Sequence, residues 1–245
     1  MNRQNPLQVI QNVLKHAQAS DDAQHRPVAS TGIPPELARL REFQCRRIAQ
    51  TYRDFAAQPQ YASVMQFFLN DLYGPRDYTQ RDHDAERAHN FLKKFVPAEM
   101  LKLATDAIEL TRLSHNLDET LLRVLANEFG APQQLTAELY AKAYRRCDNY
   151  AERQEQIELL VNVMRDAADT AHMLLTAPAL RLAKGPAYAA GWNEMYEFLE
   201  RGHHAFAQVK HPEKFLNAIE ERETKIMQRI ARGETNPFHV QVAKP

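Results

Sequence analysis

Hydrophobic residues in this chain recur at steps of three and four positions, which is the spacing of one face of an α-helix. The pattern is densest between residues 61 and 72, where apolar positions cover most of the circumference of the predicted helix. These positions are Tyr61, Val64, Met65, Phe67, Phe68, Leu69 and Leu72. A helix that is apolar on most sides belongs inside a bundle. Gly74-Pro75 predicts its end, because glycine permits positive φ and proline cannot continue a helix.

Further helices are predicted between the proline and glycine breaks along the rest of the chain. Pro35 begins one of them, and the cleanest apolar stripe runs from Ile157 to Leu175. No stretch shows the alternation of apolar and polar residues that is typical of a β-strand. The sequence therefore predicts an all-α protein, a single multi-helix bundle of about seven to nine helices.

The chain divides into three expected parts. Residues 1–34 are predicted to form a short helix and a polar linker, residues 35–232 the helical bundle domain, and residues 233–245 a flexible tail. No segment inside the bundle domain is long and polar enough to separate two domains. The linker suggests that the first helix docks loosely or serves as an arm toward a partner.

Composition narrows the function classes. The chain has 31 Lys and Arg against 31 Asp and Glu, and this balance argues against nucleic-acid and membrane-surface binding, which favour a basic excess. Cys45 and Cys147 lie far apart in sequence and indicate reduced thiols. Neither a signal peptide nor an apolar run of membrane-spanning length is visible, so we expect a cytoplasmic protein.

Charged and hydrogen-bonding residues gather directly after the densest apolar helix, and we name residues 71–82 the charged turn. Its candidate binding residues are Asp71, Tyr73, Arg76, Asp77, Arg81 and Asp82. A rigid helix that ends in polar groups is a suitable support for a binding surface. The preferred prediction is a non-enzymatic protein that binds a protein partner or a small ligand here, with a homodimer left open.

Glu223 interrupts the apolar stripe of the last predicted helix, in line with Ile219, Ile226 and Ile230. A carboxylate on a buried face needs a cation or several hydrogen-bond donors. The basic residues expected to supply its partner are His203, Arg201, Arg76 and Arg81. Two interpretations stay open: Glu223 belongs to a structural buried pair, or it is the floor of a polar pocket with the charged turn as its rim.

An alternative prediction is a metal-carboxylate oxidase or oxygenase in the bundle core. Acid-x-x-His pairs occur at Glu86/His89, Asp169/His172 and Glu200/His203. Di-iron and di-manganese bundles use such pairs on two helices with a Glu from each of two others. Only His203 lies near the middle of an apolar stripe, so His203 and Glu200, with Glu223, are the candidate iron or manganese ligands. A core imidazole with one hydrogen-bond partner is the simpler interpretation of His203, and the preferred prediction has no cofactor.

A third prediction is a ligand-sensing bundle with an apolar cavity, lined by Tyr188, Trp192 and Tyr196. Aromatic residues at helical spacing are more often part of a core. The sequence contains no glycine-rich phosphate loop and no Gly-x-Ser-x-Gly motif, so it names no reaction.

Two short runs give the chain a family resemblance. They are FFLNDLYGPRD at residues 67–77, followed by Arg81-Asp82, and FLERG at residues 198–202. With them the chain resembles an uncharacterised family of proteobacterial helical proteins over roughly residues 36 to 238. The resemblance implies a bacterial, single-domain helical protein, and it implies no activity.

Overall fold

The structure, a computed structural model, describes residues 32–92, 98–174 and 176–239. In these ranges it contains ten α-helices, one π-helical segment and no β-strand. The predicted all-α fold is confirmed. The number of helices exceeds the predicted seven to nine partly because a four-residue helix, α3 (Arg53–Ala56), makes a separate corner between two longer ones.

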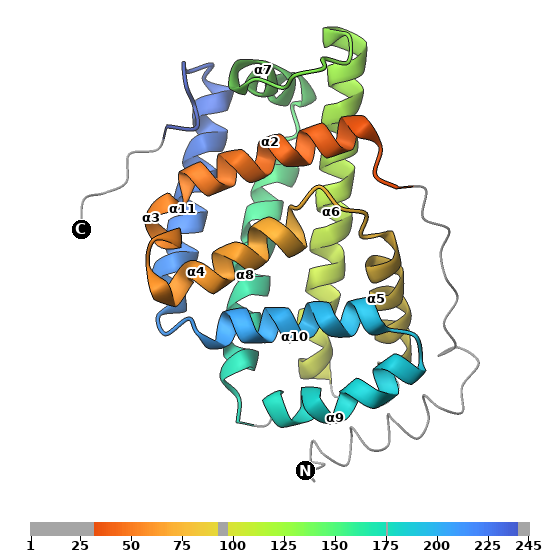
Figure 1. Cartoon of the computed structure of the whole chain (residues 1–245). Coiled ribbons are helices and arrows are strands. Elements are labelled where there is room, and N and C mark those ends of the chain that lie inside the picture. The colour runs from red at the N-terminus through yellow and green to blue at the C-terminus, as the bar shows by residue number, and fades with distance from the viewer. Residues whose placement is uncertain (1–31, 93–97, 175, 240–245) are drawn as a thin grey trace.

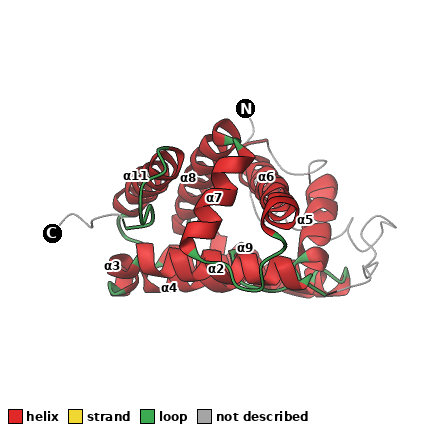
Figure 2. Ribbon diagram, turned by 90° about the horizontal axis from the view of Figure 1, so that it is seen from above, coloured by secondary structure: helices red, strands yellow, loops and turns green. Residues whose placement is uncertain are grey.

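Three long helices stand side by side and form one layer (Figure 1). They are α6 (Ala98–Phe129), α8 (Tyr150–His172) and α11 (Pro212–Ala231). α8 is central and contacts both of the others. Shorter helices cross this layer on one side, as the view from above in Figure 2 shows. The crossing helices are α2 (Pro35–Thr51), α4 (Pro59–Phe67) and α10 (Asn193–Ala207).

Three further helices complete the fold. α5 (Thr79–Leu92) packs against α6 and α10, and α7 (Ala137–Cys147) packs against α6 and α11. α9 (Thr176–Ala189) connects α8 to α10. Among the helices of the three described ranges, none combines the length and the apolar composition that crossing a membrane requires.

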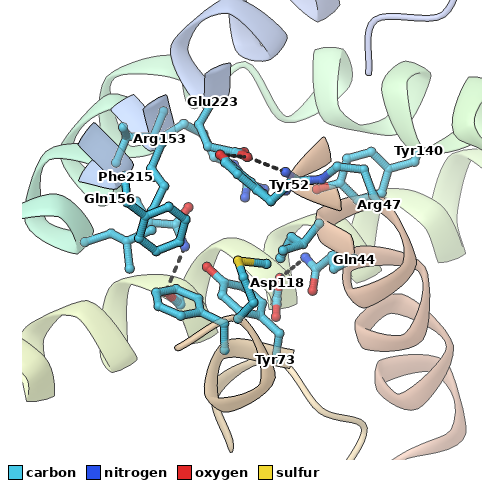
Figure 3. Close-up of a pocket in the computed structure, with 17 residues that line it drawn as sticks. Gln44, Arg47, Tyr52, Tyr73, Asp118, Tyr140, Arg153, Gln156, Phe215 and Glu223 are labelled. Carbon is cyan, nitrogen blue, oxygen red and sulfur yellow. Dashed lines mark hydrogen bonds and ion pairs between the residues drawn. The ribbon is translucent and has the colours of Figure 1, made fainter. Parts of the chain in front are cut away.

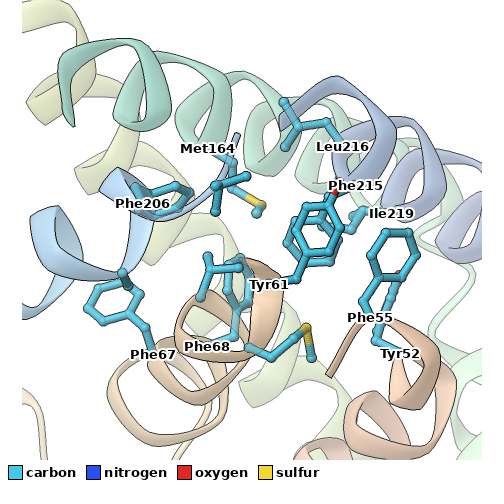
Figure 4. Packing of buried hydrophobic residues seen from close by; sticks show 14 of the residues in the cluster. Tyr52, Phe55, Tyr61, Phe67, Phe68, Met164, Phe206, Phe215, Leu216 and Ile219 are labelled. Atoms are coloured by element: carbon cyan, nitrogen blue, oxygen red, sulfur yellow. The ribbon is translucent and has the colours of Figure 1, made fainter. Parts of the chain in front are cut away.

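Buried hydrophobic side chains form two clusters. The larger one joins the ends of α2 and α3 to α4, α8, α10 and α11, with Tyr61 fully buried at its centre (Figure 4). The predicted core positions Tyr61, Val64, Met65 and Phe68 are all buried in it. The second cluster joins α2, α6, α7 and α11. Packing of crossing helices against a layer explains why the dense apolar helix needs hydrophobic residues on most of its sides.

The predicted helix over residues 61–72 changes its geometry at Phe68. α4 ends at Phe67, and the chain continues as the π-helical segment η2 (Phe68–Leu72). The amide of Tyr73 closes this segment by donating to the carbonyl of Phe68 at 3.0 Å. This five-residue spacing stacks the rings of Phe68 and Tyr73, whose centroids lie 6.5 Å apart with an angle of 17° between the ring planes. π-helical turns inside α-helices occur frequently at functional sites.

The glycines of the two motifs mark close approaches. A Cβ on Gly74 would lie 2.7 Å from the carbonyl oxygen of Asn70, so this position has no room for a side chain. The positive φ predicted for Gly74 is not observed. Glycine is required at this position because a Cβ atom would collide with neighbouring atoms. A Cβ on Gly202 would lie 3.1 Å from the ring of Phe67, which shows how tightly α10 packs on α4.

The two ends of the chain differ in how far the structure tests them. The predicted N-terminal helix and most of its linker lie outside the described residues. Of the segment predicted to be a flexible tail, residues 233–239 are described, and Phe238 packs against Phe43 and Tyr140 with ring centroids 6.0 and 5.8 Å apart. This part of the segment is therefore attached to the second hydrophobic cluster.

Candidate functional site

A cavity of about 80 Å³ lies where the crossing helices meet the layer of long helices (Figure 3). One part of its wall is apolar and consists of Ile48, Met65, Phe68, Ile157, Leu160, Phe215 and Ile219. The other part is polar and consists of Gln44, Arg47, Tyr52, Tyr73, Ser114, Asp118, Tyr140, Arg153, Gln156 and Glu223. A second cavity of about 50 Å³ adjoins the first one, and both are lined by Arg47, Arg153 and Glu223.

Glu223 lies in this wall and is paired with a cation, as its position in an apolar stripe predicted. Its partner is Arg47, whose Nη1 lies 2.5 Å from Oε1, and the hydroxyl of Tyr52 donates to the same oxygen at 2.8 Å. Burial alone would lower the pKa of Arg47, but Glu223 and nearby tyrosines raise it above its ordinary value. Arg47 therefore stays charged.

The partner of Glu223 was predicted wrongly, because none of the four basic residues proposed from the sequence is Arg47. Helical periodicity reports which face of a helix is buried, but not which distant helix packs against that face. A weaker signal was present in α2, where Gln44, Arg47 and Thr51 recur at steps of three and four beside the apolar stripe.

Arg153 was missed by the sequence analysis, although it shows the same signal as Glu223. It stands four positions before Ile157 in the apolar stripe of α8, and its residue is 5% exposed. Its guanidinium lies 4.5 Å from the centroid of the Tyr144 ring, and Nη2 donates to the carbonyl of Leu117 at 3.5 Å. Nε has no hydrogen-bond partner among the residues that the structure describes.

Gln44 and Asp118 form the next part of the polar wall. Nε2 of Gln44 donates to Oδ1 of Asp118 at 2.9 Å, while Oε1 of Gln44 has no partner within the described part of the chain. Gln44 is 6% exposed. Burial raises the pKa of Asp118, and the hydrogen bond from Gln44 and the charge of Arg153 act in the opposite direction. Asp118 therefore holds a proton more readily than an exposed aspartate does.

Neutral hydrogen-bonding groups complete the wall. Nε2 of Gln156 donates to Oγ of Ser114 at 2.7 Å, which joins α8 to α6. The hydroxyl-bearing side chains of Tyr52 and Tyr73 also face the cavity (Figure 3). Burial raises the pKa of both tyrosines, and the negative charge of Glu223 raises it further. They remain neutral and can both donate and accept a hydrogen bond.

The charged turn contributes only Tyr73 to this cavity. Asp71 accepts a hydrogen bond from Arg201 on α10 at 2.8 Å, and Arg81 donates to the carbonyl of Asp71 at 2.6 Å. Arg81 also pairs with Asp82 at 2.6 Å and lies over the ring of Phe198 at 4.7 Å.

The remaining two candidate binding residues of the charged turn, Arg76 and Asp77, also have contacts inside the chain. Asp77 accepts from the amide of Thr79 at 2.9 Å, and the carbonyl of the exposed Arg76 accepts from Arg41 at 2.8 Å. The predicted rim around Glu223 is therefore not formed. The side-chain and backbone contacts of the charged turn instead connect η2 and α5 with α2 and α10.

The candidate metal ligands are not brought together. Glu200 is exposed and accepts from the hydroxyl of Tyr196 at 3.2 Å, and neither Glu200 nor His203 lines the cavity with Glu223. His203 is partly buried and hydrogen-bonded to the backbone of Ala171, and burial lowers its pKa. In the described ranges, no group of three or more His, Cys, Asp or Glu side chains is placed to share a metal ion.

The aromatic residues considered for an apolar cavity lie elsewhere. Tyr188 and Tyr196 pack edge to face between α9 and α10, with centroids 5.9 Å apart. Trp192, at the start of α10, is buried. The observed cavity differs from the predicted one in position and in having a polar wall.

The chain matches, over residues 23–237, the sequence profile of the family described as Domain of unknown function (DUF8198). The chain belongs to this family. The DUF8198 match includes both short motifs and every residue that lines the two cavities except Phe238 of the second one. It agrees with the expected resemblance to an uncharacterised family, while the proteobacterial origin stays a prediction. Comparisons with curated proteins and with solved structures gave no match.

Proposed function

We propose that this DUF8198 domain is a non-enzymatic helical bundle that binds a small organic molecule in the cavity between α2, α6, α8 and α11. One observation carries the proposal: Gln44 and Arg153, both more than nine-tenths buried, line the cavity, and each has a buried polar atom without a described partner. Buried polar atoms are nearly always hydrogen-bonded, and each exception needs an explanation. A molecule held in the cavity supplies the missing partners.

The composition of the wall supports binding. Small-molecule sites combine apolar walls with a few convergent polar groups, and this cavity places Met65, Phe68 and Phe215 opposite a polar wall. The described residues of the wall include no Cys or His, and the carboxylates of Glu223 and Asp118 already accept hydrogen bonds. These features favour recognition over nucleophilic or acid–base catalysis.

The cavity is a stronger candidate than the charged turn. Four charged side chains of the turn already have partners inside the chain, so a second protein would have to replace these contacts or add to them. They are Asp71, Asp77, Arg81 and Asp82. A cytoplasmic location is part of the proposal, and it agrees with the free thiols of Cys45 and Cys147.

Nuclear magnetic resonance of the isotope-labelled full chain, titrated with a mixed library of small polar and apolar compounds, tests the proposal. We expect binders to shift the amide signals of Gln44, Arg153 and Gln156 but not those of α9. Ser114→Met adds volume at the cavity wall and should weaken binding, whereas Ser114→Ala removes the same hydroxyl without adding volume. If no compound shifts the cavity signals, or if Ser114→Met binds like Ser114→Ala, the proposal is wrong.

A further inference from the structure

Of the two arginines that line the cavity, one has an acidic partner and the other has none among the described residues. This difference indicates which ligands fit, and the inference rests on the proposed function. Arg47 has its counter-charge in Glu223 at 2.5 Å. Arg153 has no ion pair with a described residue, and its contacts are the ring of Tyr144 and one long hydrogen bond to a carbonyl. A buried charge without a partner is costly, so an anion beside Arg153 would be stabilised.

Arg222, a second buried arginine, has a carboxylate partner and serves as a comparison for Arg153. Arg222 is 9% exposed and contacts both carboxylate oxygens of Asp54, at 2.8 and 2.7 Å. It also donates to the carbonyl of Thr51 at 2.8 Å. Arg153 is more deeply buried and has none of the equivalent carboxylate contacts, although it faces a cavity. The difference between the two arginines corresponds to one missing carboxylate.

We infer that the ligand is a short-chain carboxylate, whose anionic group binds Arg153 and whose remaining atoms lie against the apolar wall. A planar carboxylate fits the guanidinium fork. Phosphate fits less well, because it has no apolar part and carries more charge than one uncompensated arginine balances. The free acceptor Oε1 of Gln44 favours a molecule that also carries a hydroxyl group.

The size of the cavity limits the length of the acid. An apolar cavity of about 150 Å³ accepts benzene, which has six carbons. A volume of about 80 Å³ therefore suits an acid of about two to four carbons, and the adjoining cavity of about 50 Å³ leaves room for a substituent. A ligand of this size reaches micromolar affinity at best, so the expected dissociation constants lie between about 10 µM and a few millimolar.

A substitution of Asp118 tests the inference independently of Arg153. Asp118 lines the same cavity as Arg153, and the charge of this arginine acts on its carboxyl group, so Asp118 could compete with a bound anion for Arg153. Asp118→Asn keeps the shape and the oxygen that accepts from Gln44, but it removes the negative charge. This variant should bind a carboxylate at least as tightly as the wild type, in contrast to a change at Arg153.

Isothermal titration calorimetry of the full chain with lactate, propionate, propionamide and inorganic phosphate tests the inference. We expect one site for lactate and propionate, at least tenfold weaker binding of propionamide, and still weaker binding of phosphate. Arg153→Met should reduce propionate affinity at least tenfold, and Asp118→Asn should maintain or increase it. The comparison of propionate with propionamide needs only the wild-type chain, so it stands even if Arg153→Met does not fold.

The outcomes separate this inference from the proposed function. Equal affinities for propionate and propionamide would overturn the carboxylate assignment while leaving a ligand-binding cavity. Phosphate binding that is tighter than propionate binding would also overturn it. If none of the four probes binds while other compounds of the library shift the cavity signals, the carboxylate assignment fails and the proposed function stands. If nothing binds in either experiment, both fail.

Discussion

Tyr52 donates its hydroxyl hydrogen bond, at 2.8 Å, to the same oxygen of Glu223 that Arg47 contacts. One carboxylate on α11 thus binds two groups from α2 and its C-terminal cap. The contact joins the crossing helices to the layer of long helices, and it forms one side of the cavity.

Removal of the Glu223 carboxylate should destabilise the fold. In Glu223→Ala the guanidinium of Arg47 stays largely buried without its partner, and such changes cost about 3–5 kcal/mol. Glu223→Gln keeps the shape and some hydrogen bonding, so it should cost less, about 1–3 kcal/mol. Urea unfolding of both variants measures these losses. Glu220→Ala, on the exposed face of α11, is the control and should stay within about 0.5 kcal/mol of the wild type.

Arg222→Lys should destabilise the protein although it keeps the charge. A lysine cannot reproduce the two contacts to Asp54, the contact to Thr51 and the stacking over Phe55, whose ring centroid lies 5.1 Å away. We expect a loss of about 2 kcal/mol in urea unfolding. Arg46→Lys, on an exposed ion pair, should change the free energy of unfolding by less than about 0.5 kcal/mol. Equal effects of the two changes would show that the geometry of the Arg222 contacts does not contribute.

Two glycine-to-alanine changes inside helices should have opposite signs. Gly185 in α9 has no atom within 4 Å of a new Cβ, so Gly185→Ala should stabilise the protein by about 0.5–1 kcal/mol. In Gly202→Ala the new Cβ meets the ring of Phe67, and the overpacking, which costs about 1–3 kcal/mol, should exceed the gain in helix propensity. Thermal unfolding compares them. Combination with Phe67→Leu should relieve the Gly202→Ala defect, and an undiminished defect would contradict the contact.

His203 should make the protein less stable in mild acid. Burial lowers the pKa of His203, with a further lowering by the charges of His204 and His172. The unfolded chain therefore binds a proton more readily than the folded one, so this stability is present above about pH 6.5 and is lost as the pH falls. His203→Gln should show a smaller loss of melting temperature between pH 7 and 5.

The sequence predicted the features that depend on local spacing. The steps between Tyr61 and Phe68 identify a buried helix, because the residues that share its face are close in the chain. Glu223 was recognised as a paired carboxylate for the same reason, although it is partly rather than fully buried. The identity of its partner depends on how α2 crosses α11, 176 positions away in sequence, and no local pattern contains that information.

The cavity also lies beyond what spacing can predict. The local sequence around each wall residue is compatible with an ordinary helix. The cavity forms only because the side chains of several packed helices leave a space between them. Arg153 could have been found, since it extends the stripe of Ile157 and Met164 by one turn. In the described ranges His203, Glu200 and Glu223 are not placed to share a metal ion, because a motif on α10 does not determine how far it lies from a residue on α11.

The π-helical turn also makes the site sensitive to the length of the chain. A π-turn accommodates one residue more than an α-helix would between the same two ends. Deletion of Asn70 would allow η2 to close as an α-helix between the same two ends, so Tyr73 would keep its place in the cavity wall. An inserted residue would instead rotate every later position of the segment by about 100°, and Tyr73 would leave the wall. Residues 68–72 should therefore tolerate the loss of one residue better than the gain of one.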